Sequence, residues 1–114
     1  MRKILLLSVL TMAISYCYGQ KIYQADSADE AQVKVYPADI PDEADLWVCF
    51  VWDESELTRT GLWMDMRFDH EAEIIIFFVD DEEQADLKIW LVDTQEESKW
   101  LNPEKKKLLK VTKD

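Results

Sequence analysis

The segment Phe77–Asp93, FFVDDEEQADLKIWLVD, contains two apolar runs joined by a short acidic stretch. In its second run, alternate residues from Ala85 to Leu91 are apolar, which is the spacing of a β-strand with one buried face. Trp90 and Val92 make the end of this run apolar on both faces, so we expect the second half of the strand to be covered on both sides. The segment therefore predicts a strand, a polar joint and a second strand.

The same pattern recurs along the chain. Four stretches align without gaps: DEAQVKVY (29–36), DEADLWVC (42–49), HEAEIIIF (70–77) and EQADLKIW (83–90). The first two and the last two are each 13 residues apart, and they define six units that begin at Lys21, Lys34, Trp47, Leu62, Ile75 and Lys88. The third unit is two residues longer, with its surplus in LTRTG (57–61). Because one such unit cannot bury its apolar face alone, the repeat predicts a mainly β fold, with six strands around one core in one small domain.

The joints between the strands are expected to be single helical turns. Three of them carry Ser or Asp three residues before Glu, which is the spacing of a capping box. The pairs are Ser27–Glu30, Asp80–Glu83 and Asp93–Glu96. Asp80 is therefore predicted to cap its joint. Pro37 and Pro41 would interrupt a central ladder, so we expect the second strand to lie at a sheet edge or to bend there.

The letters DEAD at Asp42–Asp45 raise the question of an RNA helicase. A helicase needs a phosphate loop of the form GxxxxGK(S/T). The chain has only two glycines, Gly19 and Gly61, so no such loop can be written. We therefore interpret DEAD as one copy of the structural repeat.

The first 19 residues have the pattern of a secretory signal peptide. A basic start is followed by the apolar run Ile4–Ser15 and by small residues at 17 and 19. Cleavage after Gly19 would give a periplasmic or secreted bacterial protein, residues 20–114, without a membrane anchor. Cys17 would be removed with the peptide, so Cys49 would be the only thiol and no internal disulfide could form.

The chain is strongly acidic, with 24 acidic and 13 basic residues and a net charge of −11. Nucleic acids and anionic membrane surfaces repel a negative body, so we expect neither as a partner. Residues 105–114 reverse this pattern, with five lysines and one acidic residue. We therefore divide the mature chain into a domain at 20–101 and a lysine-rich tail at 102–114. Asn102 and Pro103 suit the start of a short helix.

The tail is expected to be solvated, held to the acidic body only by exposed charges. The alternative is that Leu108, Leu109 and Val111 dock on the body as an apolar stripe.

We expect no catalytic, cofactor-binding or metal-binding residues. Cys49 occupies a strand position in an apolar stretch, which is typical of a buried structural cysteine. His70 lies in a joint without a nucleophile and an orienting group that the sequence would place beside it. The four carboxylates of Asp80–Glu83 could supply oxygen ligands for calcium, but consecutive residues rarely converge on one ion.

Five tryptophans invite a carbohydrate-binding interpretation, which we weigh against a role in the core: Trp47, Trp52, Trp63, Trp90 and Trp100. Four lie in apolar strand stretches, and Trp100, at the end of the domain, is expected to be the exposed one.

The opening segment also resembles the bacterial septoil knot family, a domain of unknown function. Repeats of that family run strand, Val-Asp, polar turn, Gln-Ala-Asp-Leu-Lys, strand. Val79-Asp80 and Gln84–Lys88 match this pattern, and weaker copies lie at 30–33 and 43–46. GLWMDMRF (61–68) stands where the family breaks its repeat with a glycine and an aromatic residue.

The resemblance covers about residues 21–100 and implies a small β-rich domain whose backbone ties a seven-crossing torus knot. It brings no established activity. Two features depart from the family pattern, Arg67 in the fourth unit and Ser98–Trp100 in the sixth.

We therefore expect an exported, monomeric, non-catalytic structural or binding module without a cofactor. The first alternative is a module that binds a divalent cation or a protein, like an inhibitor, at its acidic turns. A small hydrolase is a further alternative, and it would need a polar cleft.

Overall fold

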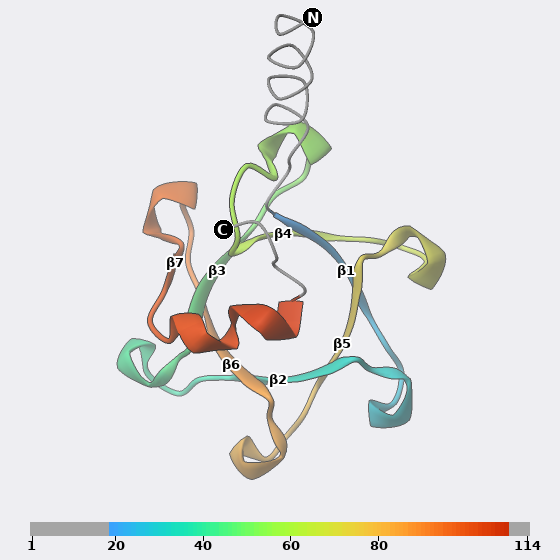
Figure 1. The fold of residues 1–114 in the computed structure, drawn as a ribbon, viewed down its shortest axis with the longest axis vertical. Coiled ribbons are helices and arrows are strands. Elements are labelled where there is room, and N and C mark those ends of the chain that lie inside the picture. Colours follow the sequence, from blue (N-terminus) through green and yellow to red (C-terminus); the bar gives the residue numbers. More distant parts are fainter. Residues whose placement is uncertain (1–18, 110–114) are drawn as a thin grey trace, which may run out of the picture.

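The computed structural model describes residues 19–109, in which short strands alternate with single turns of 3-10 helix (Figure 1). The strands are β1 (Gln20–Gln24), β2 (Val33–Pro37), β3 (Leu46–Phe50), β4 (Leu62–Asp65), β5 (Ile74–Phe78), β6 (Leu87–Leu91) and β7 (Lys99–Trp100). The 3-10 helices are η1 (Ala28–Glu30), η2 (Pro41–Glu43), η3 (Glu54–Glu56), η4 (Asp69–Glu71), η5 (Glu82–Gln84), η6 (Gln95–Glu97) and the longer η7 (Pro103–Leu109). The predicted signal peptide, apart from Gly19, and residues 110–114 lie outside the described residues.

Six strands form a closed ring in which all neighbours are parallel. Their order is β4–β1–β5–β2–β6–β3, and β3 pairs again with β4. β7 adds to β3 in the antiparallel direction. Consecutive strands of the ring are separated by one other strand, except for β3 and β4. The chain therefore travels around the ring twice, and the strands of the second circuit lie between those of the first (Figure 1).

The predicted mainly β fold with repeated strand–turn units is confirmed, and each of the six ring strands begins at the first residue of a repeat unit or one residue before it. The expectation of an edge position for the second strand is wrong, because a closed ring has no edge. β2 lies between β5 and β6, and Pro37 is its last residue. The ladder continues at the next residue, since the Ala38 N–H donates to the Ile89 carbonyl over 2.8 Å.

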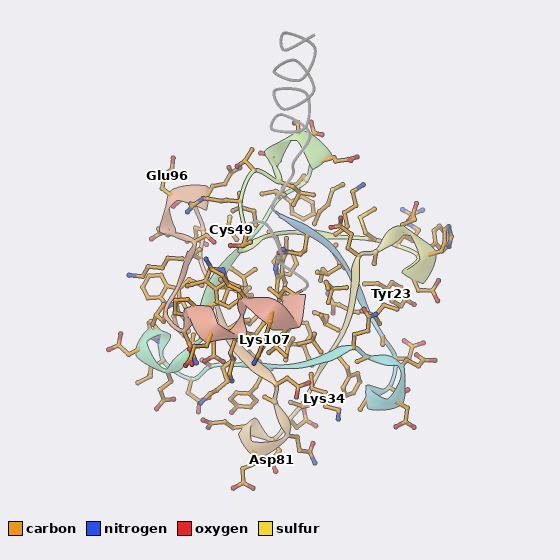
Figure 2. All side chains as sticks on the ribbon, in the orientation of Figure 1. Tyr23, Lys34, Cys49, Asp81, Glu96 and Lys107 are labelled. Atoms are coloured by element: carbon orange, nitrogen blue, oxygen red, sulfur yellow. The ribbon has the colours of Figure 1, made fainter. Side chains whose placement is uncertain are left out.

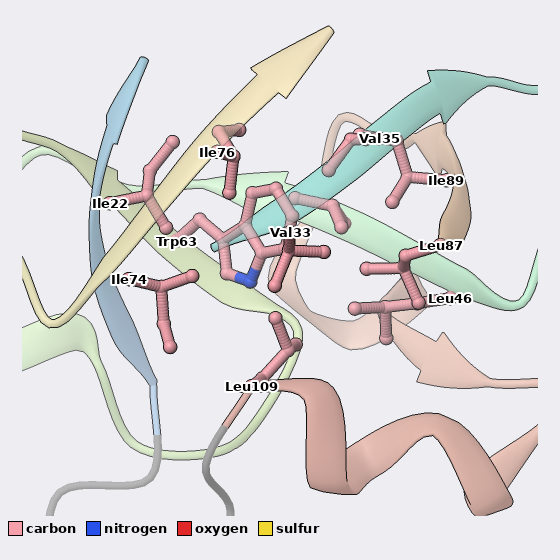
Figure 3. Packing of buried hydrophobic residues seen from close by; sticks show 11 residues of the cluster. Ile22, Val33, Val35, Leu46, Trp63, Ile74, Ile76, Leu87, Ile89 and Leu109 are labelled. Carbon is pink, nitrogen blue, oxygen red and sulfur yellow. The ribbon is translucent and has the colours of Figure 1, made fainter. Parts of the chain in front are cut away.

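Alternate residues of the ring strands point inward and fill the ring (Figure 3). Trp63 is the largest of them and is fully buried, and its ring forms a T-shaped pair with the Phe50 ring. The core comprises Ile22, Val33, Val35, Leu46, Val48, Trp63, Ile74, Ile76, Leu87, Ile89 and Leu109. On the other face of β3 and β4, Cys49 and Leu62 form a second, smaller cluster with Val51 and Leu57.

Most joints cross the strand that lies between the two strands they connect. In the joint 25–32, the Ala25 N–H donates to the Ile76 carbonyl of β5, and the Gln32 N–H donates to the Ile75 carbonyl, both over 2.7 Å. Carbonyls of successive strand residues face opposite edges of the strand. The two ends of the joint therefore hold opposite edges of β5.

The residue after the crossing makes a second bond to the same strand residue. The Ile75 N–H donates to Gln32 Oε1 over 2.9 Å, so Gln32 and Ile75 exchange two hydrogen bonds. We call this two-bond contact the clamp. It recurs, with donor–acceptor distances of 2.7–3.0 Å, between Asp45 and Lys88, Glu73 and Lys21, and Asp86 and Lys34. The last letter of DEAD is thus a clamp residue, in keeping with its interpretation as part of a structural repeat.

The joints are single helical turns, as predicted, but two predicted caps are wrong by one residue. The Asp81 side chain, and not that of Asp80, accepts from the N–H of Glu83 over 3.1 Å. The next joint has its capping box at Thr94 and Glu97 instead of Asp93 and Glu96. The reason is that the ladder extends past the end of β5, where the N–H of Val79 still donates to the Val35 carbonyl of the neighbouring strand β2. The turn therefore begins later than the spacing alone indicates.

The predicted cap at Ser27 and the capping box observed at η3 also differ from the expectation. Ser27 is the N-cap of η1, yet its side chain makes no capping hydrogen bond. Asp53 and Glu56 form a capping box at η3 that the sequence analysis did not single out.

The helix η7 lies across one end of the ring (Figure 1). Leu109 is 2% exposed and belongs to the main core, with Leu108 packed against it. Lys105 Nζ lies 3.2 Å from Asp45 Oδ2 and 3.0 Å from the Asp86 carbonyl oxygen. Since these two residues immediately precede β3 and β6, η7 covers the end of the ring where the strands begin.

The expectation of a solvated tail is therefore wrong for residues 103–109. Apolar docking, which was the alternative, describes Leu108 and Leu109, while Val111 lies outside the described residues. The domain boundary at 101 stays a prediction.

Candidate functional site

Outward-facing positions of the strands β1, β2 and β6 carry a lysine with an aromatic residue two positions later. In β6, Lys88 Nζ lies 2.8 Å from Glu82 Oε2, a carboxylate six residues earlier in the preceding turn. In β1, Lys21 Nζ lies 3.0 Å from Glu54 Oε2. The equivalent lysine of β2 is Lys34, and the position six residues before it is Ala28. The repeat therefore leaves Lys34 without the carboxylate that Lys88 has.

A hollow of about 400 Å³ lies beside Lys34, at the turns η1 and η5. Figure 2 shows Lys34 and Asp81 in the same region of the molecule, where η5 lies next to β2. We call this space the η1–η5 hollow, and its lining residues are Ala28, Lys34, Phe77, Val79, Asp80, Asp81 and Gln84. The small side chain of Ala28 stands where a glutamate would reach toward the lysine, so the hollow and the missing carboxylate have one cause.

Three polar side chains of the η1–η5 hollow have no partner within residues 19–109. They are the Lys34 ammonium, the Asp80 carboxylate and the Gln84 amide, which form neither a side-chain hydrogen bond nor an ion pair there. The Asp81 carboxylate accepts the capping hydrogen bond of η5 at Oδ1, which leaves Oδ2 as an acceptor for a ligand. Phe77 and Val79 supply an apolar wall. The hollow thus presents both charge signs and an amide beside an aromatic ring.

The backbone around the η1–η5 hollow is held in place by the fold. The N–H of Lys34 donates to Asp86 Oδ2 over 2.9 Å in the clamp, and the N–H of Val79 donates to the Val35 carbonyl over 2.9 Å. Polar groups on a fixed backbone can bind a ligand with little loss of conformational entropy. The site is consequently suited to binding.

A second hollow, of about 220 Å³, is apolar. Pro37, Ala38, Ile89, Trp90 and Leu91 line it, and Leu91 is 55% exposed. This surface offers a contact for another apolar group but no charged side chain that would orient a small ligand.

Cys49 lies in the smaller cluster, where its Sγ is 3.7 Å from the Phe50 carbonyl oxygen. Burial, and then the nearby carboxylates, Asp93 foremost, raise the pKa of the Cys49 thiol, which disfavours the reactive thiolate. His70 is exposed on η4 and stacks on Phe68, with ring centroids 5.7 Å apart. These positions fit the predicted structural role of Cys49 and give His70 no thiol to activate.

The acidic run Asp80–Glu83 does not converge on one point. Asp81 caps η5, Glu82 pairs with Lys88, and Asp80 lines the η1–η5 hollow. In the described part of the chain, no three His, Cys, Asp or Glu side chains are grouped so that they could hold a metal ion. The calcium alternative therefore gains no geometric support.

No helix among residues 19–109 is long and apolar enough to cross a membrane.

A family model described as the 7(1) septoil knot domain matches residues 19–101. The chain belongs to this family. The match extends from the residue before β1 to the residue after β7, and the resemblance read from the opening segment is confirmed. Two interleaved circuits around one ring are the winding that a two-turn torus knot requires, which agrees with the family's description. No curated protein and no solved structure matches the chain significantly. The septoil knot domain is not a known enzyme family.

Two features of this septoil knot domain were not predicted from the sequence. The exposed tryptophan is Trp52, at 86%, and not Trp100, whose Nε1 donates to Thr60 Oγ1 over 2.7 Å. The expectation for Trp100 was wrong because β7 pairs antiparallel with β3 and so brings this side chain back onto the ring. The η1–η5 hollow was also missed, although aligning Lys34 with Lys88 would have shown Ala28 in place of Glu82.

Proposed function

We propose that this septoil knot domain is an exported, non-catalytic binding module that takes a small polar ligand in the η1–η5 hollow. The observation that carries the proposal is the convergence of three partnerless polar side chains, Lys34, Asp80 and Gln84, on one hollow. Polar side chains without partners at a concave site are typical of small-ligand binding, in which a few polar groups orient the ligand against an apolar wall.

Binding is a better-supported role than catalysis. A hydrolase needs a nucleophile activated by a base, and Cys49 is buried with a raised pKa while His70 is exposed on another turn. The η1–η5 hollow contains carboxylates, an amide and an ammonium group, which recognise a ligand through charge and hydrogen bonds.

The proposal is tested by a small-molecule screen on the folded, isotope-labelled protein, with backbone amide resonances as the readout. Binding compounds should shift the amides of Lys34, Phe77 and Gln84. The variant Ala28→Glu should abolish these shifts, because the new carboxylate would reach Lys34 as Glu82 reaches Lys88. Lys21→Met is the matched control, since it removes the equivalent lysine of β1, and it should leave the shifts intact.

Two results would contradict the proposal. One is a set of compounds that shift only residues at the apolar hollow, around Trp90 and Leu91. The other is a set of shifts at the η1–η5 hollow that persist in Ala28→Glu.

Export is part of the proposal and rests on the apolar run Ile4–Ser15. Intact mass of the natively expressed protein should give a chain that begins at Gln20. A cytoplasmic species that retains Met1 would contradict export without affecting the binding site.

A further inference from the structure

We infer that the ligand of the η1–η5 hollow is a small zwitterion of amino-acid to dipeptide size, with an ammonium group and a carboxylate. This inference rests on the proposed binding function and adds the chemical class of the ligand. The hollow joins one unpaired ammonium to unpaired or half-used carboxylates, and a ligand that satisfies both must carry both charges.

A purely anionic ligand would pair with Lys34 but would meet Asp80 and Asp81, which line the same hollow. Two carboxylates at the site would repel such a ligand. A phosphate or a dicarboxylate is therefore disfavoured.

A purely cationic ligand would pair with Asp80 but would leave the Lys34 ammonium without a counter-charge. It would also place two positive groups in one hollow. The Phe77 ring is a suitable wall for the cationic end of a zwitterion, because the face of an aromatic ring attracts an ammonium group. The Gln84 amide can donate or accept a hydrogen bond and suits a peptide or carboxylate group between the charged ends.

The size of the hollow indicates how much of a ligand it can enclose. A volume of about 400 Å³ is at the small end of ligand pockets, which hold roughly 300–1,000 Å³. A free amino acid or a dipeptide would fill this volume.

The test compares three related probes: dialanine, N-acetyl-dialanine and dialanine amide. The first carries both charges, the second lacks the ammonium group and the third lacks the carboxylate. Titration followed at the amides of Lys34 and Gln84 should show that dialanine binds and that either cap weakens binding by about tenfold or more, as the loss of a charge-assisted hydrogen bond predicts.

Two variants assign the charges to residues. In Lys34→Met, dialanine and dialanine amide should bind equally weakly, because the group that distinguishes a free carboxylate is gone. In Asp80→Asn, the preference of the site for dialanine over N-acetyl-dialanine should shrink. Lys21→Met should leave all three titrations unchanged.

The outcomes separate this inference from the proposed function. If the three probes bind with equal affinity, or none binds while other compounds of the screen shift Lys34 and Phe77, the zwitterion is wrong and the binding function stands. If neither the probes nor any screened compound shifts these residues, both are wrong. Free alanine that binds as tightly as dialanine would support the inference with an amino acid as the ligand.

Discussion

At each clamp, a side-chain oxygen accepts a hydrogen bond from a strand N–H. Asp45 and Asp86 hold equivalent positions, but Asp45 is buried and also accepts from Asn102 and Lys105, whereas Asp86 is exposed. Asp86→Ala should lower the free energy of unfolding by about 0.5–1.5 kcal/mol, the usual net contribution of a hydrogen bond. Asp45→Ala should cost more, since it removes the acceptor of three part-buried donors, the Lys88 N–H, Asn102 Nδ2 and Lys105 Nζ. Equilibrium urea unfolding measures both variants.

The matched control for the clamp prediction is Asp80→Ala. Its carboxylate has no partner among residues 19–109, so the change in stability should stay within about 0.5 kcal/mol. A loss for Asp80→Ala as large as that for Asp86→Ala would contradict the placement of the cap at Asp81 and the role of the clamp.

The Cys49 thiol should react slowly in the folded protein and rapidly in urea. Burial raises its pKa above the ordinary value of 9.0, so the folded state favours the protonated thiol. The stability that this preference contributes is fully present below pH 9.0 and is lost as the pH rises through the folded-state pKa. Thiol labelling at pH 8 measures the first effect. Labelling of the folded protein at the urea rate would show that the cluster around Cys49 opens to solvent.

At the scale of elements, the repeat predicted the strands well because strand identity is a local property. Apolar runs at the repeat spacing mark the ring strands, and Leu87–Leu91 in addition shows the alternating pattern of a strand. The order of strands in the ring is different, because it depends on which unit lies beside which. Nothing in DEADLWVC indicates that β6 will separate β2 from β3. The η1–η5 hollow was missed for a related reason: the alignment of Lys34 with Lys88 shows the missing carboxylate, but only the fold brings η1 and η5 together around it.

The long third joint requires a glycine at one position. Gly61 has a φ of 94°, and a Cβ there would lie 2.3 Å from Ser98 Oγ. Gly61→Ala should therefore destabilise by more than the roughly 1–2 kcal/mol cost of the left-handed conformation alone. The loss should be smaller in a Ser98→Ala background, which removes the closest atom. Thermal unfolding of the unchanged protein, the two single variants and the double variant measures how the two substitutions depend on each other. Strictly additive losses would contradict the predicted clash.

At the scale of the whole molecule, the interleaved circuits leave β3–β4 as the one ring pair between consecutive strands, and the other five ring pairs join strands that are distant in the sequence. β1 pairs with β4 and β5, and β2 with β5 and β6, so half of the chain must be in place before either circuit has its neighbours. Folding is slow when native contacts join distant parts of the chain, because loops must close before the contacts form. We expect refolding from urea to take seconds or longer, measured by tryptophan fluorescence after dilution. Refolding within milliseconds would show that the denatured chain keeps its winding.

The contacts that η7 makes at one end of the ring place this part of the tail within the fold. Leu109 completes the core from outside the two circuits, and Lys105 bridges the strands β3 and β6 through Asp45 and Asp86. Leu109→Ala should lower the free energy of unfolding by about 2–5 kcal/mol, as truncation of a buried leucine does. This loss should be the same at low and high salt, because it arises from packing.

Deleting residues 103–114 should cost at least as much as Leu109→Ala, with a further part that shrinks in salt. The salt-sensitive part would come from exposed lysines of the tail near an acidic body, whose attraction is screened over roughly 8 Å at physiological ionic strength. Lys107→Gln is the control for surface charge alone, since Lys107 is exposed, and it should change stability by less than about 1 kcal/mol. Urea unfolding of these chains at both salt concentrations separates the two contributions. If the deletion costs little and its whole effect disappears at high salt, Leu109 does not belong to the core and the domain ends before η7.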